Sequence, residues 1–382
     1  MSDDRPLSGV RIVEISSFVA VPLAGMTLAQ LGAEVVRIDP VGGAADYRRW
    51  PVTEAGESIY WAGLNKGKRS MSVDMRTPDG QALVQRLIAA AGVLITNVAG
   101  RQWHSYEALS ALRPDLIHLE VLGRADGTTG VDYTVNAATG FPLVTGPADH
   151  VGPVNHVMPS WDVSCGLYAA LAVVTALRRR DTTGRGGSIR LPLDDVALAT
   201  AANLGFLTEV MVNGEQRPRL GNAVFGQYGQ DFTSSDGGAF MVVALTPRHF
   251  AQLAALTGTT KAVAALAESL GADFTDEGER YRHRDVLSAL FSAWFRRHTA
   301  EEVTAALAGS SVLWERYQSF AEVAASPRVT ANPLFSRLDQ PRIGTHLAPG
   351  LPMSFDGNHI RPEPAPALGA DNEAVPGEWL GE

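Results

Sequence analysis

The chain has 382 residues, 45% of them hydrophobic and 19% charged, which is the composition of a folded protein of about two domains and not of a disordered chain. Its formal net charge of −9 disfavours a surface that binds the phosphate backbone of nucleic acids. The single cysteine, Cys165, excludes an intramolecular disulfide and a zinc site of several thiolates.

The start of the chain lacks the basic residues and apolar run of a signal peptide. No uninterrupted apolar stretch reaches the length of a bilayer span. We therefore expect a cytoplasmic globular protein without a membrane or nucleic-acid partner.

The first forty residues predict a βαβ unit. Residues 10–15 alternate in hydrophobicity and predict a strand, and residues 33–39 predict a second one. Pro22 is suited to open a helix over 23–31 between them. The loop at 16–22 is apolar and carries no G-x-G-x-x-G motif, so a redox dinucleotide site is not expected.

Two loops beyond this unit have features of binding segments. The sequence at 46–51 combines arginines with aromatic residues, and the segment at 63–70 is a basic turn with glycines. The basic turn is either a solvated cap of a hairpin or a cradle for phosphates. Position alone favours the second reading only slightly.

Strands and helices continue to alternate up to about residue 191. Strands are predicted at 71–74, 93–98, 116–122 and 188–191, and helices at 78–91, 105–112 and 167–180. This alternation predicts an α/β fold with a doubly wound, mostly parallel, Rossmann-like sheet. A long apolar helix over 194–213 is expected to lie in the core or at a subunit interface.

The composition changes after about residue 213 and predicts a smaller α+β domain. Its expected elements are a strand at 239–245 and helices at 248–256, 260–270 and 285–297. We expect residues 1–213 to form a large domain, completed by 320–382, and residues 214–319 to form the small one. The tail from Pro341 is rich in proline and glycine, which predicts an extended strap.

Asp162 stands at the junction between a proline-bearing loop and a helix that ends in three arginines. A carboxylate at such a junction can cap the helix, held by backbone N–H groups and the helix dipole. It can also be a nucleophile that attacks an acyl substrate. These residues by themselves leave both roles open.

Several segments in order along nearly the whole chain resemble the family III (CaiB/BaiF) CoA transferases. These segments are Leu7–Glu14, Pro22–Ala24, Leu31–Ile38, Asn65–Ser70 with Asp74, Thr182–Gly186 and Glu322–Val329. The resemblance implies an interlocked homodimer and a catalytic aspartate at Asp162. It therefore favours the nucleophile over a role as a cap alone, although both can hold.

Within the family, the resemblance is strongest to members that move CoA between C1 and C4 of mesaconyl-CoA. It rests on Phe18–Ala20, Gly25–Ala33, Asp46–Thr53, Tyr60–Asn65, Val131–Asn136, Val154–Pro159 and Trp161–Asp162. It implies an aspartyl mixed anhydride followed by an aspartyl-CoA thioester. Coenzyme A thus takes part as the thioester of the acyl substrate, and neither a metal nor a prosthetic group is expected.

The resemblance also implies contacts to the substrate. The implied CoA contacts are Val19, Ala20, Asn97, Arg101, Lys68 and Arg69, of which the last two are equally well explained as structural residues. A diacid retained in the site needs a cation for its distal carboxylate, and the candidates are Arg48, Arg49 and Arg124. His156 is a further candidate for substrate contact, and a plain loop histidine explains it equally well.

Three alternatives stay open. The enzyme could transfer CoA between two separate acids, or the chain could be a non-catalytic CoA-binding protein in which Asp162 only caps a helix. An α-methylacyl-CoA racemase is disfavoured, because Val131 occupies the place of that enzyme's proton-moving histidine.

Overall fold

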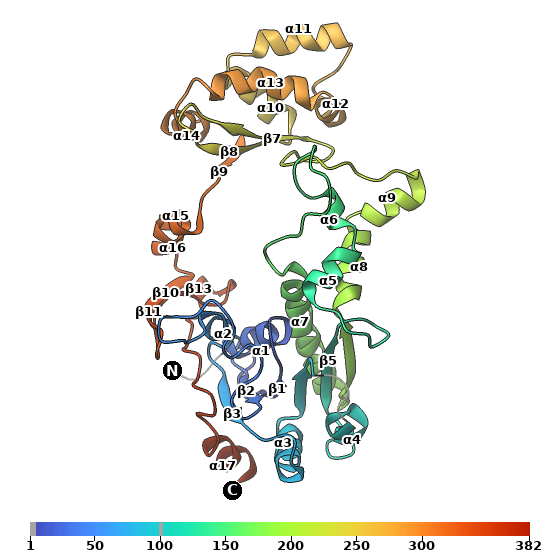
Figure 1. Cartoon of the computed structure of the whole chain (residues 1–382), viewed down its shortest axis with the longest axis vertical. Helices are drawn as coiled ribbons and strands as arrows, with labels where there is room; N and C mark the ends of the chain where they lie inside the picture. Colours follow the sequence, from blue (N-terminus) through green and yellow to red (C-terminus); the bar gives the residue numbers. More distant parts are fainter. Residues whose placement is uncertain (1–4, 99–101) are drawn as a thin grey trace. The chain divides into compact units, whose positions relative to one another are not determined.

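The computed structural model describes residues 5–98 and 102–382, which form two compact units (Figure 1). The larger unit comprises the described residues of 1–139, 156–214 and 325–382, and the smaller unit comprises 140–155 and 215–324. The segment 140–155, expected in the large domain, thus belongs to the smaller unit. Each unit is described by itself below.

The larger unit is built on a parallel sheet of six strands in the order β3-β2-β1-β4-β5-β6. The strands are β1 (Arg11–Ile15), β2 (Glu34–Asp39), β3 (Arg69–Ser72), β4 (Val93–Thr96), β5 (Ile117–Leu122) and β6 (Gly187–Pro192). This confirms the doubly wound, Rossmann-like sheet expected from the sequence. The strand order reverses between β1 and β4, and ligands of such sheets bind beyond the carboxyl ends of the strands at this point.

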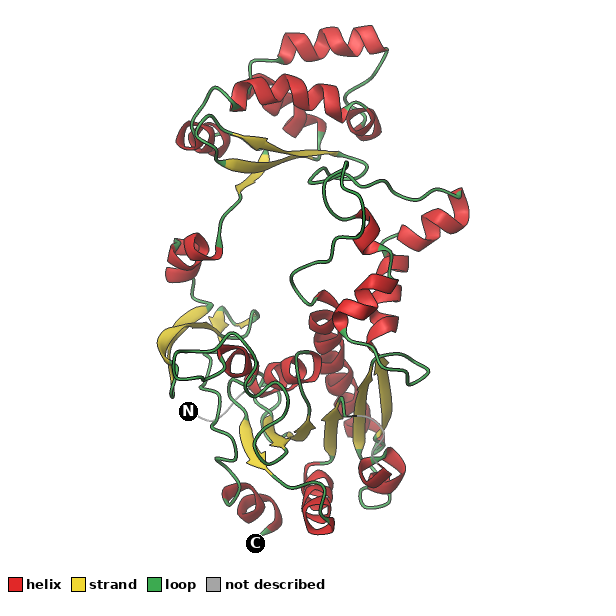
Figure 2. Cartoon of the chain, in the orientation of Figure 1, coloured by secondary structure: helices red, strands yellow, loops and turns green. Residues whose placement is uncertain are grey.

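Helices cover both faces of this sheet (Figure 2). On one face, α3 (Pro78–Ala91) and α17 (Ala374–Leu380) pack over alternate residues of the central strands. On the other, α1 (Ala20–Gln30) packs against α7 (Ser160–Thr183), which also contacts β5. The shorter helices of the unit are α2 (Ile59–Leu64), α4 (Tyr106–Ser110), α5 (Asp132–Ala138), α8 (Leu193–Asn203), α9 (Phe206–Asn213) and α16 (Pro327–Thr330).

Three predicted helices differ from the observed ones. The first begins at Ala20, and Pro22 lies inside its first turn. The N–H groups of a first turn have no acceptor within the helix, so the missing N–H of proline costs no hydrogen bond there. The helix predicted at 167–180 begins already at Ser160 and therefore contains Asp162. The helix predicted at 194–213 is broken by Gly205, whose φ of 84° interrupts the helix between α8 and α9 and lets them bend by 57°.

Helix α7 stands out in the larger unit by its length and apolar composition. By length and composition alone, it is long and apolar enough to cross a membrane. The bent pair of α8 and α9, taken as one segment, is also long and apolar enough. In the larger unit α7 packs on α1 and the sheet, and the core helix of a globular protein meets these criteria equally well.

The smaller unit has an antiparallel sheet in the order β7-β8-β9 with helices packed on it. Its elements are α6 (Phe141–Val144), β7 (Tyr228–Thr233), β8 (Ala239–Ala244), α10 (Pro247–Leu256), α11 (Thr260–Leu270), α12 (Glu277–Arg282), α13 (Arg284–Phe295), α14 (Ala300–Ala308) and β9 (Leu313–Arg316). Phe232 and Phe295 stack in its core with ring centroids 4.3 Å apart. Helix α15 (Phe320–Ala325) leads back to the larger unit.

The C-terminal tail is extended only in part. It forms the antiparallel pairs β10 (Phe335–Gln340) with β11 (Gly344–Pro349) and β12 (Ser354–Phe355) with β13 (Asn358–His359). It then ends in the helix α17, which the expected strap did not include. Val375 and Trp379 of α17 are buried in the core beneath α3, and this burial explains why the end of the chain is helical.

Candidate active site

The first turn of α7 is held by a carboxylate from another helix. Asp132, the first residue of α5, accepts hydrogen bonds at Oδ2 from the backbone N–H groups of Trp161 (2.8 Å) and Asp162 (3.2 Å). Asp132 is only 2% exposed. The capping role that the sequence left open for Asp162 therefore belongs to Asp132.

The Asp162 carboxylate itself faces a cavity of about 640 Å³. Among the described residues, no hydrogen bond ends on its two oxygens. The cavity lies where the loops after β1, β4 and β5 meet the first turns of α5 and α7, at the strand-order reversal. Its size and position are those of a ligand pocket of a doubly wound fold.

The surroundings of Asp162 make its carboxylate unusually basic. Burial and, to a smaller extent, the nearby negative charge of Asp132 raise the pKa of Asp162 to about 6, although the positive charge of Arg49 opposes both. At neutral pH the group is still mostly ionised. It is therefore available as a nucleophile and is more basic than a carboxylate in water.

Arg49 is the single lysine or arginine that lines this cavity among the described residues. Its guanidinium carbon lies 5.4 Å from the ring centroid of Phe18 and 5.1 Å from that of Tyr60. Stacking of this kind holds a guanidinium in place while its N–H groups stay free for an anion. Arg49 can thus hold a carboxylate at the same cavity as Asp162.

The loop after β1 is fixed on β4 by Asn97. The Asn97 side chain accepts from the N–H of Ser17 (3.0 Å) and donates to the carbonyl of Ser17 (2.8 Å). The next residue, Phe18, has a φ of 66°, a conformation that costs a non-glycine residue about 1 kcal/mol or more. This strained turn directs the Phe18 ring to Arg49.

The predicted CoA contacts fall into three groups. Val19, Ala20 and Asn97 line the cavity, although the amide of Asn97 is used by Ser17. Arg101 lies outside the described residues. Lys68 and Arg69 do not line the cavity.

The side chains of Lys68 and Arg69 are both engaged elsewhere. The Nζ of Lys68 is buried and donates to Glu14 Oε1, Asn65 Oδ1 and the carbonyl of Pro22 at 2.8–2.9 Å. Burial lowers the pKa of Lys68 to about 8. Arg69 pairs with carboxylates of β2 and of the C-terminal tail. The geometry therefore favours the structural alternative for both residues.

The candidate cations for a distal carboxylate are reduced to one. Arg124 donates to the carbonyl of Thr129 (2.8 Å) and holds the loop after β5, and Arg48 is exposed and does not line the cavity. His156 does not line the cavity either, and its Nε2 lies 2.8 Å from Oδ1 of Asp132. Arg49 is the candidate that the structure brings to Asp162.

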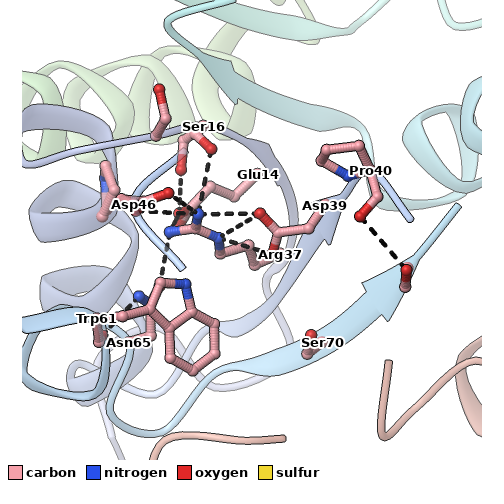
Figure 3. A network of polar contacts seen from close by, with 12 residues as sticks. Glu14, Ser16, Arg37, Asp39, Pro40, Asp46, Trp61, Asn65 and Ser70 are labelled. Carbon is pink, nitrogen blue, oxygen red and sulfur yellow. Dashed lines mark hydrogen bonds and ion pairs between the residues drawn. The ribbon is translucent and has the colours of Figure 1, made fainter. Parts of the chain in front are cut away.

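A buried ionic network supports the loop that carries Arg49 (Figure 3). Arg37 of β2 is 1% exposed and donates to Asp39 and Asp46 at 2.9–3.2 Å, and also to the carbonyl of Ser16. Asp46 lies three residues before Arg49, so the network ties this loop to the sheet. The sequence shows Arg37 only as a polar residue in an apolar strand.

A second cavity of about 450 Å³ lies at the same edge of the sheet. Ser17 lines both cavities, and Val98 after β4 and Pro40 after β2 also line the second one. Arg76, which pairs with Asp74, supplies a cation there. The two cavities are therefore neighbours at the switch point of the sheet.

Comparison with known proteins gives concordant results. The sequence model of the CoA-transferase family III matches residues 7–372. The chain is 46% identical to 2-methylfumaryl-CoA isomerase of Chloroflexus aurantiacus, over 98% of this chain and 94% of the relative. It is 30% identical to succinate–glutarate CoA-transferase of Agrobacterium fabrum, over 97% and 94% of the two chains. The crystal structure of a CaiB/BaiF family protein from Brucella suis superposes with a TM-score of 0.81 and 28% identity, covering 98% of this chain and 99% of that one.

Proposed function

Since the chain belongs to the CoA-transferase family III and is an enzyme that transfers CoA, we propose that it moves CoA from the C1 to the C4 carboxylate of 2-methylfumaryl-CoA (mesaconyl-CoA), with Asp162 as the covalent nucleophile. One observation carries the choice of nucleophile: the Asp162 carboxylate faces a large cavity and, within residues 5–98 and 102–382, makes no helix-capping hydrogen bond and no ion pair. The 46% identity to a 2-methylfumaryl-CoA isomerase supports the choice of substrate.

The proposed chemistry is a series of acyl transfers. An oxygen of Asp162 attacks the thioester carbon at C1, and the C–S bond breaks. CoA is released as a thiolate, and the diacid is now joined to Asp162 as a mixed anhydride. The thiolate then attacks the Asp162 carbonyl of the anhydride, which forms an aspartyl-CoA thioester and releases the C1 carboxylate. The C4 carboxylate next attacks the aspartyl thioester, whose C–S bond breaks, so that a mixed anhydride joins C4 to Asp162 and the CoA thiolate is released. The thiolate then attacks the C4 carbonyl of this anhydride, which places CoA on C4 and frees the Asp162 carboxylate. Protons are neither consumed nor released overall.

Arg49 would retain the diacid between the two halves of this sequence. While CoA is attached to Asp162, the diacid carries two carboxylates and can leave the site, and a guanidinium binds a carboxylate through two parallel N–H groups. The cavity walls at Val19, Ala20 and Leu122 are apolar and limit water, which would otherwise hydrolyse the anhydride. Retention makes the net reaction an isomerisation.

The proposed path of CoA uses the second cavity. We place the acyl and pantetheine parts in the cavity of Asp162 and the nucleotide in the neighbouring one, because Ser17 joins them and Arg76 offers a cation for phosphate. This arrangement follows the general rule that nucleotides bind beyond the carboxyl ends of the strands at the switch point.

The isomerase proposal is tested by label exchange. We expect mesaconyl-C1-CoA to become mesaconyl-C4-CoA in the presence of an excess of ¹³C-labelled mesaconate, with almost no label in the product by mass spectrometry. The Asp162→Ala variant serves as the inactive control. Rapid incorporation of label would instead support transfer between two separate acids, the alternative that the sequence left open.

Replacement of Arg49 tests its role in retention. We expect Arg49→Gln to lower kcat/KM by about 100-fold, because the diacid loses its ion pair and its alignment with the aspartyl thioester. We also expect free mesaconate and labelled product to appear, measured by the same exchange assay. Arg48→Gln is the matched control, since Arg48 lies one residue away and does not line the cavity. Equal effects of the two substitutions would contradict this role.

We further propose that the enzyme is a homodimer, interlocked as the family resemblance implies, and that it works in the cytoplasm without membrane or nucleic-acid partners. Four apolar side chains of α7 and α9 are 53–79% exposed in the single chain: Leu167, Leu171, Met211 and Val212. An apolar groove of about 410 Å³ also runs between α7 and the edge strand β6. Apolar surface of this extent on a soluble protein usually marks an interface.

The dimer is tested by its mass in solution. We expect light scattering after size exclusion to give twice the subunit mass for the wild type, and Leu171→Glu to yield monomers or aggregates, because it places a charge on the covered apolar face. Val151→Glu is the control, since Val151 is 91% exposed and belongs to the smaller unit. A monomeric wild type with full activity would rule out the dimer.

A further inference from the structure

Asp132 is the point at which three segments of the larger unit meet. Its Oδ2 accepts the N–H groups of Trp161 and Asp162, and its Oδ1 lies 2.8 Å from Nε2 of His156. Trp161 makes a second link between α7 and α5 through its indole N–H, which donates to Asn136 Oδ1 (3.1 Å). Both oxygens of the buried Asp132 carboxylate are therefore engaged, by His156 and by the first turn of α7 and not by Arg49.

His156 lies behind the first turn of α7. Its side chain is 23% exposed, and its ring centroid lies 6.2 Å from that of Tyr133 and 6.1 Å from that of Trp161. Because its Nε2 faces a carboxylate oxygen, Nε2 is the nitrogen that carries the proton in this contact. The aromatic neighbours fix the plane of the imidazole, so the bond to Asp132 has a defined direction.

We infer that His156 and Asp132 act together as a positioning pair for Asp162, in which His156 holds the Asp132 carboxylate and Asp132 in turn holds the first turn of α7 and presents its negative charge to the nucleophile. This inference rests on the proposed role of Asp162 and extends it. Neither His156 nor its contact takes part in a covalent step. The pair is instead a means to set the direction and the basicity of the attacking oxygen.

The charges around Asp162 show what the pair contributes. Groups of the described residues that interact electrostatically with Asp162 include Asp132 of α5, Arg49 of the loop before α2, Tyr60 of α2 and Cys165 of α7. Burial and Asp132 raise the pKa of Asp162, and Arg49 lowers it. Loss of the Asp132 charge would therefore leave a less basic carboxylate, and loss of His156 would leave Oδ1 of Asp132 buried without its donor.

Two substitutions of His156 separate positioning from simple packing. His156→Phe keeps a flat ring between Tyr133 and Trp161 but removes the donor, and His156→Gln restores an N–H donor near the place of Nε2. We expect His156→Phe to lower kcat by about 100-fold with KM changed less than about threefold, since misplacement of a reacting group by about 1 Å has effects of this size. We expect His156→Gln to recover at least about tenfold of this loss.

The charge of Asp132 is tested by the pH profile. Asp132→Asn keeps the shape of the side chain and one acceptor for the helix N–H groups. We expect the acid limb of its kcat profile to move by about one unit to lower pH, with a lower plateau, because the attacking carboxylate is less basic. The same shift should appear without substrate, as a change in the ¹³C-NMR titration of the Asp162 carboxyl in the free protein.

The outcomes separate this inference from the proposed function. Equal kcat for His156→Phe and His156→Gln, or an unchanged titration of Asp162 in Asp132→Asn, would overturn the positioning pair. If Asp132→Asn does not fold, the two His156 variants decide alone. Failure of the proposed function would appear differently, as the absence of an acyl group on Asp162 in the wild type, whereas the NMR titration does not depend on activity.

Discussion

Replacement of Asp162 by asparagine is expected to lower the rate of CoA transfer by about four to six orders of magnitude, the range seen when an essential nucleophile is removed. Asparagine has nearly the same shape, so the cavity and the first turn of α7 should be retained, because the N-terminal cap of the helix is Asp132. The amide oxygen cannot form the anhydride. The measurement is the conversion of mesaconyl-C1-CoA followed by liquid chromatography.

Trapping gives the positive counterpart of this experiment. The wild type, incubated with acyl-CoA and hydroxylamine, should yield a hydroxamate at Asp162 that mass spectrometry of peptides locates, and Asp162→Asn should yield none. A non-catalytic CoA-binding protein would give no hydroxamate with either chain. A hydroxamate on another carboxylate would contradict the assignment of the nucleophile.

Stability provides the control for folding of Asp162→Asn. Burial raises the pKa of Asp162 to about 6, above its value in the unfolded chain, so the protonated form is favoured in the folded protein. This advantage is complete below the unfolded-state pKa and is lost as the pH rises through 6. A neutral asparagine should therefore make the protein more stable than the wild type at pH 8, by at most about 3 kcal/mol, with the difference vanishing near pH 4.

The sheet could be predicted from the sequence because its signals are local. The central strands β1, β2, β4 and β5 are short, mostly apolar runs, and the helix before β4 has its own start signal at Thr77, whose side chain accepts from the N–H of Gly80. The break at Gly205 was missed because a single glycine within an apolar stretch does not show its φ. The helix at the end of the tail was missed because it is stabilised by residues far away in the sequence. Val375 and Trp379 are buried against α3, which lies about three hundred residues earlier.

Residue types and the family resemblance could predict candidate residues of the site, but not the contacts between them. Asp162 and Arg49 were both candidates, and the structure brings them to one cavity. The cap of α7 comes from Asp132, thirty residues before Asp162, so spacing along α7 could not reveal it. Lys68 has the residue type of a phosphate ligand, but only the tertiary structure shows that three internal acceptors surround its ammonium group.

The largest effect on stability is expected for Arg37→Met. Arg37 is buried and is bonded to Asp39 and Asp46, with Glu14 close by, so the substitution leaves buried carboxylates without their cation (Figure 3). Burial raises the pKa of Asp39 even in the presence of Arg37. Removal of one partner from a buried ion pair costs about 3–5 kcal/mol, and we expect a loss of this size, measured as a lower midpoint of urea unfolding at pH 8.

Comparison with an exposed arginine separates burial from charge. Arg76 also pairs with an aspartate, Asp74, but its side chain is 87% exposed, so Arg76→Met should leave the midpoint of urea unfolding nearly unchanged. The deficit of Arg37→Met should shrink as the pH falls from 8 to 5, because burial raises the pKa of Asp39 and the loss of the Arg37 charge raises it further, so that this carboxyl can fold in its neutral form. Equal stability of the two variants would contradict a structural role for the network. A loss of stability that does not depend on pH would instead come from lost packing of Arg37 on Trp61. The guanidinium carbon of Arg37 lies 5.6 Å from the ring centroid of Trp61.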